Sequence, residues 1–116
     1  MAIIKIKNLK LKAIIGVEEH ERNIRQDIII NVQLEFDAQK AVESDNLFDT
    51  IDYKALKQNI ISLVEASSFF LVEKLAGEIL KICLDNSLVT SATVEIDKPT
   101  ALQFVDSVSV TLSGEK

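Results

Sequence analysis

Cysteine and histidine are almost missing from this sequence of 116 residues, which contains one of each, Cys83 and His20. A lone cysteine cannot form an internal disulfide, and it cannot build a zinc site from cysteines. The single histidine excludes a histidine-rich metal site and most catalytic triads that use a histidine as the base. Several common kinds of metal and nucleophile chemistry are therefore removed from consideration.

Proline, glycine and long apolar runs are also scarce. One proline and three glycines exclude collagen-like and linker-like sequences. No apolar run approaches the ~18 residues of a membrane-spanning helix. The first eleven residues alternate apolar side chains with lysines, unlike the charged-then-apolar order of a signal peptide. We therefore expect a protein of the reducing cytoplasm that does not bind membranes.

Positive charge is in the minority, because 13 Lys and Arg face 18 Asp and Glu, for a net charge of −5. Phosphate binding needs a basic face, so this balance argues against general nucleic-acid binding. With 47% apolar and 27% charged residues, the composition is typical of a folded globular protein. The length predicts one domain over residues 1–116, and chains this short often build an active site with a neighbouring copy.

Apolar residues alternate with polar ones near both ends of the chain, which predicts strands. In the first strand the alternation slips by one residue at Asn8, which indicates a bulge. A charged loop over residues 18–26 precedes a second strand over 28–36. A third strand is predicted over about 89–96, and a last one over about 108–112.

Between the strand pairs the apolar period becomes helical. Residues 56, 60, 63 and 64 mark one helix, and residues 71, 75, 79 and 82 mark another, with Ser68 predicted as its N-cap. Residues 38–50 are predicted to be a loop with short turns. The order β-β-α-α-β-β predicts an α+β fold in which both helices cover one face of an antiparallel sheet. The other face would be wet or line a barrel of several copies, and it would carry Asn31, Gln33, Glu35, Ser107, Ser109 and Thr111.

Four side chains are candidates for chemistry, each with a structural alternative. Glu21 lies in the charged loop, where a solvated carboxylate is common. Glu73 lies in an apolar run, where a buried unpaired carboxylate is costly, although a helix start also favours a glutamate. Tyr53 is the only tyrosine, and most single tyrosines pack. Lys98 precedes the only proline, and a surface role is the ordinary alternative.

Taken together, the segments resemble the family of dihydroneopterin aldolases and dihydroneopterin triphosphate 2′-epimerases. The resemblance rests on GVEEHER at 16–22, RQD at 25–27, IDY at 51–53, FLVEKLA at 70–76, IDKPTAL at 96–102 and DSVSV at 106–110. It covers essentially the whole chain. Residues 6–9, 25–28 and 106–109 are most similar to the epimerase branch. The chain departs from many relatives at Ser68, where they carry an arginine before the aromatic residue.

The resemblance implies the tunnelling fold (T-fold), assembled as tetrameric rings that commonly stack into octamers, with active sites between subunits. It implies that Glu73 binds the amino and ring N–H groups of a pterin and that the backbone amide of Val72 binds the neighbouring ring oxygen. Tyr53 would come from the adjacent subunit, and Glu21 would face the hydroxylated side chain. Lys98 would be the general acid and base, acting through a water. No metal and no cofactor are implied.

The implied function is 7,8-dihydroneopterin triphosphate 2′-epimerase, acting by reversible retro-aldol cleavage of the C1′–C2′ bond. The alternative is an aldolase of folate biosynthesis that yields 6-hydroxymethyl-7,8-dihydropterin and glycolaldehyde. A non-catalytic pterin-binding protein of the same fold is a hypothesis of another class, which the presence of all four candidates disfavours. The basic residues available for a triphosphate are Lys10, Lys12, Arg22, Arg25 and Lys74.

Overall fold

Alternating and helical segments of the sequence form the elements that their periods predict. A computed structural model describes residues 1–116 and confirms the order β-β-α-α-β-β for the six main elements. Two turns of 3-10 helix, η1 (Glu19–Arg22) and η2 (Leu47–Asp49), lie in the connections. The strands and α-helices are β1 (Ala2–Ala13), β2 (Gln26–Phe36), α1 (Gln39–Ser44), α2 (Tyr53–Ala66), α3 (Val72–Asp85), β3 (Val89–Lys98) and β4 (Val108–Glu115).

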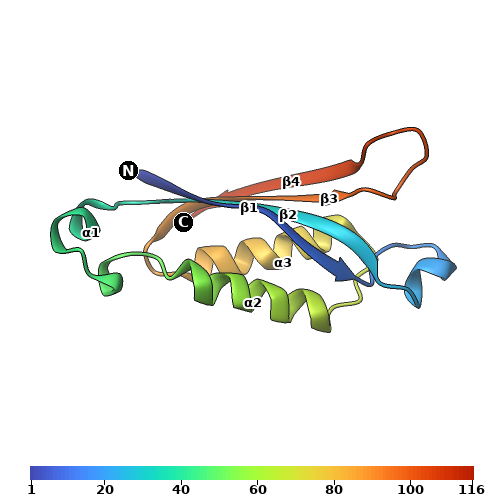
Figure 1. Ribbon diagram of the computed structural model, residues 1–116, viewed down its shortest axis with the longest axis horizontal. Coiled ribbons are helices and arrows are strands. Elements are labelled where there is room, and N and C mark those ends of the chain that lie inside the picture. The colour runs from blue at the N-terminus through green and yellow to red at the C-terminus, as the bar shows by residue number, and fades with distance from the viewer.

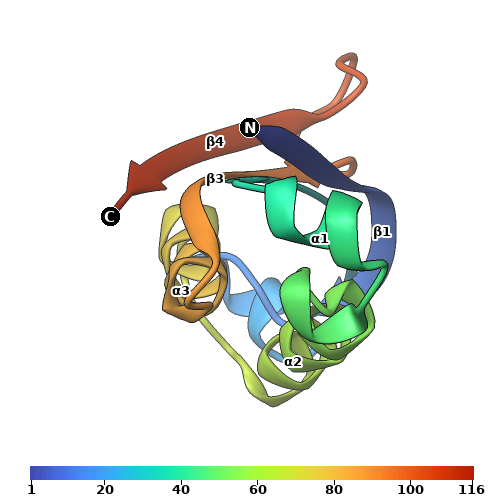
Figure 2. The same ribbon diagram turned by 90° about the vertical axis from the view of Figure 1, so that its left-hand side faces the viewer.

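The four strands form one antiparallel sheet in the order β1-β2-β3-β4. Helices α2 and α3 cover one face of it, so that sheet and helices form two layers (Figures 1 and 2). The inward residues of β2, from Ile28 to Phe36, are buried against them, whereas the residues between are partly exposed on the open face. The predicted polar face is therefore present, except that Ser107 lies just before β4.

The phase slip in the first strand is a bulge, as predicted. Pairing between β1 and β2 shifts between Ile6 and Leu9, and Asn8 adopts a left-handed φ of 54°. The Asn8 backbone N–H donates to Asn31 Oδ1 at 2.9 Å, which fixes the irregular residue. The bulge keeps apolar side chains on the helix side before and after Asn8, although their parity in the sequence differs.

The start of the last helix differs from its prediction. Helix α3 begins at Val72, and Ser68 lies four residues earlier in an extended connection instead of capping it. Tertiary contacts account for this difference, because the carbonyls of Ser68 and Phe69 accept hydrogen bonds from the β1–β2 loop. The predicted loop over 38–50 contains the short helices α1 and η2, and β3 and β4 extend further than predicted.

No helix of the protein combines the length and the apolar character that a crossing of the membrane requires. Cys83 is buried in α3, and burial raises the pKa of its thiol to about 11. Cys83 is therefore a core residue, in agreement with its place in the helical pattern.

Candidate functional site

Three separate segments meet at one end of the molecule, on the right in Figure 1. They are the β1–β2 loop with η1, the connection between α2 and α3, and the end of β3. An up-and-down arrangement of strands and helices brings these connections together, because every second connection lies at the same end. Candidates that are 77 residues apart in sequence, Glu21 and Lys98, therefore become neighbours.

Lys98 and Glu21 form an ion pair in which Lys98 Nζ donates to Glu21 Oε2 at 2.5 Å. Their side chains are only 10% and 12% exposed, and Lys98 is the only charged residue among the buried residues of the protein. Lys98 points toward the helices because it continues the inward alternation of Val94 and Ile96 along β3. A cation in this position requires a partner, so Lys98 is not an ordinary surface lysine.

The carboxylate of Glu21 is held from several sides. Besides Lys98, it accepts hydrogen bonds from the Glu18 backbone N–H and from Gln26 Nε2, each at 3.1 Å. The hydrogen bond from Lys98, with those from Gln26 and Glu18, lowers the pKa of Glu21 to about 2, although partial burial opposes this shift. Glu21 is therefore ionised throughout the neutral range.

Room for this carboxylate comes from Gly16. Its φ of +129° is a conformation that side chains rarely adopt, and a Cβ atom there would overlap the Glu21 carboxylate. Sequence patterns pointed to neither Gly16 nor Gln26 as site residues. For Gln26 a signal existed, because it shares the inward parity of Ile28 at the start of β2.

The depressed pKa of Glu21 predicts how stability depends on pH. A carboxyl with a folded pKa of about 2, against an ordinary 4.5, stabilises the fold above pH 4.5 and loses that contribution as the pH falls toward 2. The unfolding free energy of the wild type should therefore exceed that of Glu21→Gln above pH 4.5, and this difference should decrease as the pH falls from 4.5 toward 2. Urea unfolding at fixed protein concentration measures it. Glu19→Gln, an exposed neighbour in η1, is the control, and a pH-independent excess for Glu21→Gln would contradict the assignment.

Arg22 connects the β1–β2 loop to the α2–α3 connection. Its Nη1 donates to the carbonyls of Gly16 at 2.9 Å and Phe69 at 3.0 Å, and its Nη2 donates to the carbonyl of Ser68. Its guanidinium also lies 4.0 Å from the centroid of the Phe70 ring. Arg22 is one of the basic residues that could bind a triphosphate, and these contacts within the protomer already occupy its guanidinium group.

The other basic residues that could bind a triphosphate differ in the contacts that they make within the protomer. Arg25 donates to the Glu65 carbonyl at 3.3 Å, and Lys74 pairs with Glu78 at 2.8 Å. Lys12 lies 3.5 Å from Asp27 in an exposed pair, and Lys10 takes part in no ion pair. Lys10 and Lys12 border a hollow that Pro99 also lines.

Glu73 lies in the first turn of α3, at the same end as Glu21 and Lys98. Its side chain is exposed and takes part in no ion pair of the protomer. The N–H groups of Val72 and Glu73 have no partner within the helix, because they belong to its first turn. This end of α3 thus presents a carboxylate beside free backbone donors.

Tyr53 is not brought to this end of the protomer. It is the first residue of α2, and 14 residues of helix separate it by about 20 Å from the end of α2 next to the site. It is 57% exposed, at the end of α2 that faces away from the site (Figure 1). Within one protomer Tyr53 therefore does not lie beside Lys98.

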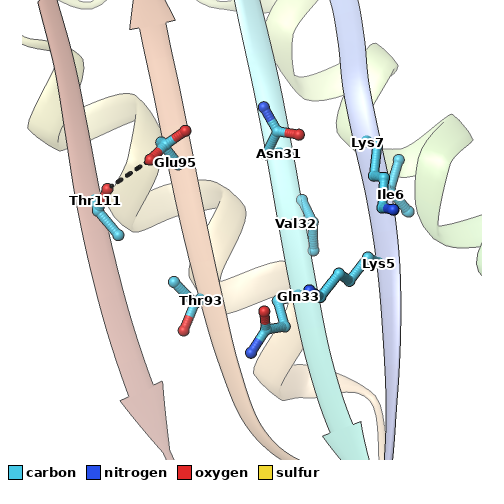
Figure 3. Close-up of a pocket in the computed structure, with 9 residues that line it drawn as sticks. All are labelled: Lys5, Ile6, Lys7, Asn31, Val32, Gln33, Thr93, Glu95 and Thr111. Atoms are coloured by element: carbon cyan, nitrogen blue, oxygen red, sulfur yellow. Dashed lines mark hydrogen bonds between the residues drawn. The ribbon is translucent and has the colours of Figure 1, made fainter.

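A separate hollow lies on the open face of the sheet (Figure 3). Polar side chains of all four strands surround it, including Lys5, Asn31 and Gln33, and Thr111 donates to Glu95 at 3.3 Å. Lys98 points to the opposite face, so this hollow is not part of the site. No group of three or more His, Cys, Asp or Glu side chains is arranged to hold a metal ion.

Comparisons with known proteins agree on one family. A family model described as "FolB: Dihydroneopterin aldolase" matches residues 4–113. Dihydroneopterin triphosphate 2′-epimerase of Escherichia coli K12 is 48% identical over 99% of this chain and 96% of its own length. The protein of the same description from Pseudomonas aeruginosa PAO1 is 40% identical, with 100% of this chain and 94% of that protein covered.

The fold is also found among solved structures. E. coli dihydroneopterin aldolase in complex with neopterin is 28% identical, with a TM-score of 0.93 and coverage of 98% of this chain and 99% of that chain. The four-stranded antiparallel sheet with its two long helices is therefore the T-fold, as the resemblance implied.

Proposed function

Because the chain belongs to the dihydroneopterin aldolase family, we propose that it is a 7,8-dihydroneopterin triphosphate 2′-epimerase. The observation that carries the proposal is the buried Lys98–Glu21 pair, which lies at the same end of the fold as the free carboxylate of Glu73. The identity of 48% with an epimerase, against 28% with an aldolase, supports the epimerase branch.

Binding of the pterin begins at α3. A pterin presents an amino group and a ring N–H side by side, and the two oxygens of the Glu73 carboxylate accept both hydrogen bonds. The backbone N–H of Val72 donates to the adjacent ring oxygen, a contact that does not depend on its side chain. The rest of the substrate then extends toward Lys98 and Glu21.

The reaction transfers a proton and breaks one carbon–carbon bond. The Lys98 ammonium donates a proton toward N5 of the pterin through a water, and the resulting amine takes the proton of the 2′-hydroxyl. The electron pair of the C1′–C2′ bond moves to C6, and that of the C6–N5 imine moves to N5. The products are an enamine and an aldehyde, and Lys98 ends in its initial charge state. The imine of the substrate is the electron sink, so this scheme requires no metal.

Two outcomes follow from this intermediate. If the aldehyde turns and C1′ attacks its other face, the reverse proton transfers give the 2′-epimer. If the enamine is protonated at C1′ and loses its N5 proton to the water instead, the C6–N5 imine forms again, and the products are 6-hydroxymethyl-7,8-dihydropterin and the aldehyde. The same residues therefore serve an epimerase and an aldolase, and the balance depends on how firmly the aldehyde is held.

The proposal is tested with 7,8-dihydroneopterin and its triphosphate in separate reactions whose products are resolved by chromatography. Fast epimerisation of the triphosphate with little 6-hydroxymethyl-7,8-dihydropterin is the expected result. Rapid cleavage of the unphosphorylated substrate would identify a folate-pathway aldolase instead. Pterin binding without reaction of either substrate would identify a non-catalytic binding protein.

The active form is proposed to be a ring of four copies, stacked into an octamer. The edge strands β1 and β4 leave backbone groups unpaired, which favours pairing with neighbouring copies. A ring also makes the open face of the sheet an interior surface, and it supplies Tyr53 from a neighbour. In such a ring, the assembly step that pairs the edge strands of neighbouring copies also completes the active site with Tyr53.

A shared site predicts that two inactive variants complement each other. Tyr53→Ala and Lys98→Met are each expected to be nearly inactive, whereas co-expression should restore about a quarter of the wild-type sites, because random assembly joins intact partners. The control combines Lys98→Met with Glu21→Gln. These two residues act within one protomer, so no site regains both. Equal recovery in the two mixtures, or none in the first, would contradict the assignment of Tyr53 to the neighbour.

A further inference from the structure

The groups proposed to hold the two ends of the substrate belong to different segments. Glu21 lies in η1 of the β1–β2 loop, whereas Val72 and Glu73 follow the α2–α3 connection. A single backbone hydrogen bond joins the two segments, from the Gly16 N–H to the Phe69 carbonyl at 3.4 Å. This bond is near the upper limit of hydrogen-bond length, so it holds the segments only weakly.

Arg22 provides the stronger connection. One guanidinium group donates to Gly16 within its own loop and to Ser68 and Phe69 in the other segment. The planar fork of an arginine suits such multiple acceptors, which the point charge of a lysine does not. Because Arg22 directly follows Glu21 in η1, fixing its position also fixes the start of the Glu21 side chain.

Apolar burial anchors part of both segments but not η1. Ile15, before η1, is buried in the core, and Phe69 packs against that core. No residue of η1 is buried, and Phe70, under the guanidinium, is 60% exposed. The position of η1 relative to the α2–α3 connection therefore depends on polar contacts of Arg22, and its loss should loosen the site without opening the core.

We propose, on the basis of the proposed function, that Arg22 is a positioning residue that sets the spacing between the pterin-binding end and the Lys98–Glu21 pair. That spacing determines whether the cleaved aldehyde stays within reach of the enamine. Arg22 thereby favours re-addition over release, and so epimerisation over cleavage. Its role is exerted through Glu21 and the start of α3, without contact to the reacting atoms.

The test compares Arg22→Gln and Arg22→Lys with Glu19→Gln, which changes an exposed side chain of the same η1 turn. For Arg22→Gln we expect kcat to fall about 10–100-fold and the ratio of epimer to 6-hydroxymethyl-7,8-dihydropterin to fall about fivefold. Arg22→Lys should be intermediate, and Glu19→Gln should keep the wild-type ratio. The ratio is decisive because it does not depend on the fraction of folded enzyme.

A lower kcat with an unchanged ratio would overturn the proposal and leave Arg22 a structural residue. Hydrogen exchange supplies the second measurement, since residues 16–22 and 67–71 should exchange faster in Arg22→Gln while the central strands keep their protection. Unchanged exchange in both segments would also overturn it. If the wild type forms neither product, the proposed function itself fails. The proposed effect of Arg22 on the product ratio then fails with it, even if hydrogen exchange shows that Arg22 connects the two segments.

Discussion

Lys98→Met is expected to lower kcat for the triphosphate by about 10²–10⁴-fold, the range for loss of a general acid and base. Methionine preserves the length and apolar stem of lysine, but it can neither donate a proton toward N5 nor take one from the 2′-hydroxyl. The variant also leaves the Glu21 carboxylate, 12% exposed, without its cation. Removal of one partner of a buried pair should cost about 3 kcal/mol of unfolding free energy.

The double variant Lys98→Met with Glu21→Gln separates the two effects. Removal of both charges should restore most of the stability, whereas kcat should stay at the level of the single variant. Lys81→Met is the control, because Lys81 is 74% exposed on α3 and pairs only with Glu78. Urea unfolding and steady-state kinetics measure the outcome. Activity regained in the double variant would show that Lys98 matters through charge balance and not through proton transfer.

Gly16→Ala is expected to destabilise the protein by about 2–4 kcal/mol and to reduce kcat together with it. A Cβ atom at this position meets the Glu21 carboxylate, and the backbone φ of +129° is strained for alanine. Relief requires Glu21 to move, which breaks its contact with Lys98. Gly16 thus contributes to the site through the space it leaves empty.

Gly77→Ala provides a matched control with the opposite sign. Gly77 lies within α3, and an added Cβ would meet only Leu112 Cδ1 at 4.0 Å, an ordinary contact. Alanine favours a helix interior over glycine, so this variant should be more stable by about 0.5–1 kcal/mol. Thermal or urea unfolding of both variants measures the comparison. Equal effects of the two substitutions would contradict the role assigned to Gly16.

Local periodicity was enough to predict the sheet, the two long helices and the bulge at Asn8, because each depends on which side chains face the core. It failed for Ser68, where a residue with a good capping side chain lies in an extended segment. Hydrogen bonds to Arg22, 46 residues away, determine that conformation. No pattern of neighbouring residues carries such a contact.

The site was predictable only in part. Lys98 and Gln26 share the inward parity of their strands, so an inward polar residue at a strand end was a signal already present in the sequence. The family resemblance selected Lys98, Glu21 and Glu73, which the fold brings to one end. The position of Tyr53 relative to them stays a prediction, because it depends on a neighbouring copy. The need for Gly16 becomes visible only from its backbone angle and from the direction of Glu21.

The bulge at Asn8 has a consequence for how the gene of this protein can change length. Asn8 is the one additional residue of the bulge, so its deletion would place Ile6 and Leu9 two residues apart, which is the same-face spacing of a regular strand. A codon deletion at the bulge therefore keeps the apolar residues of β1 on the core side, whereas a deletion elsewhere in the strand turns one part of it to the opposite face. Natural variation in the length of β1 should therefore be confined to the bulge.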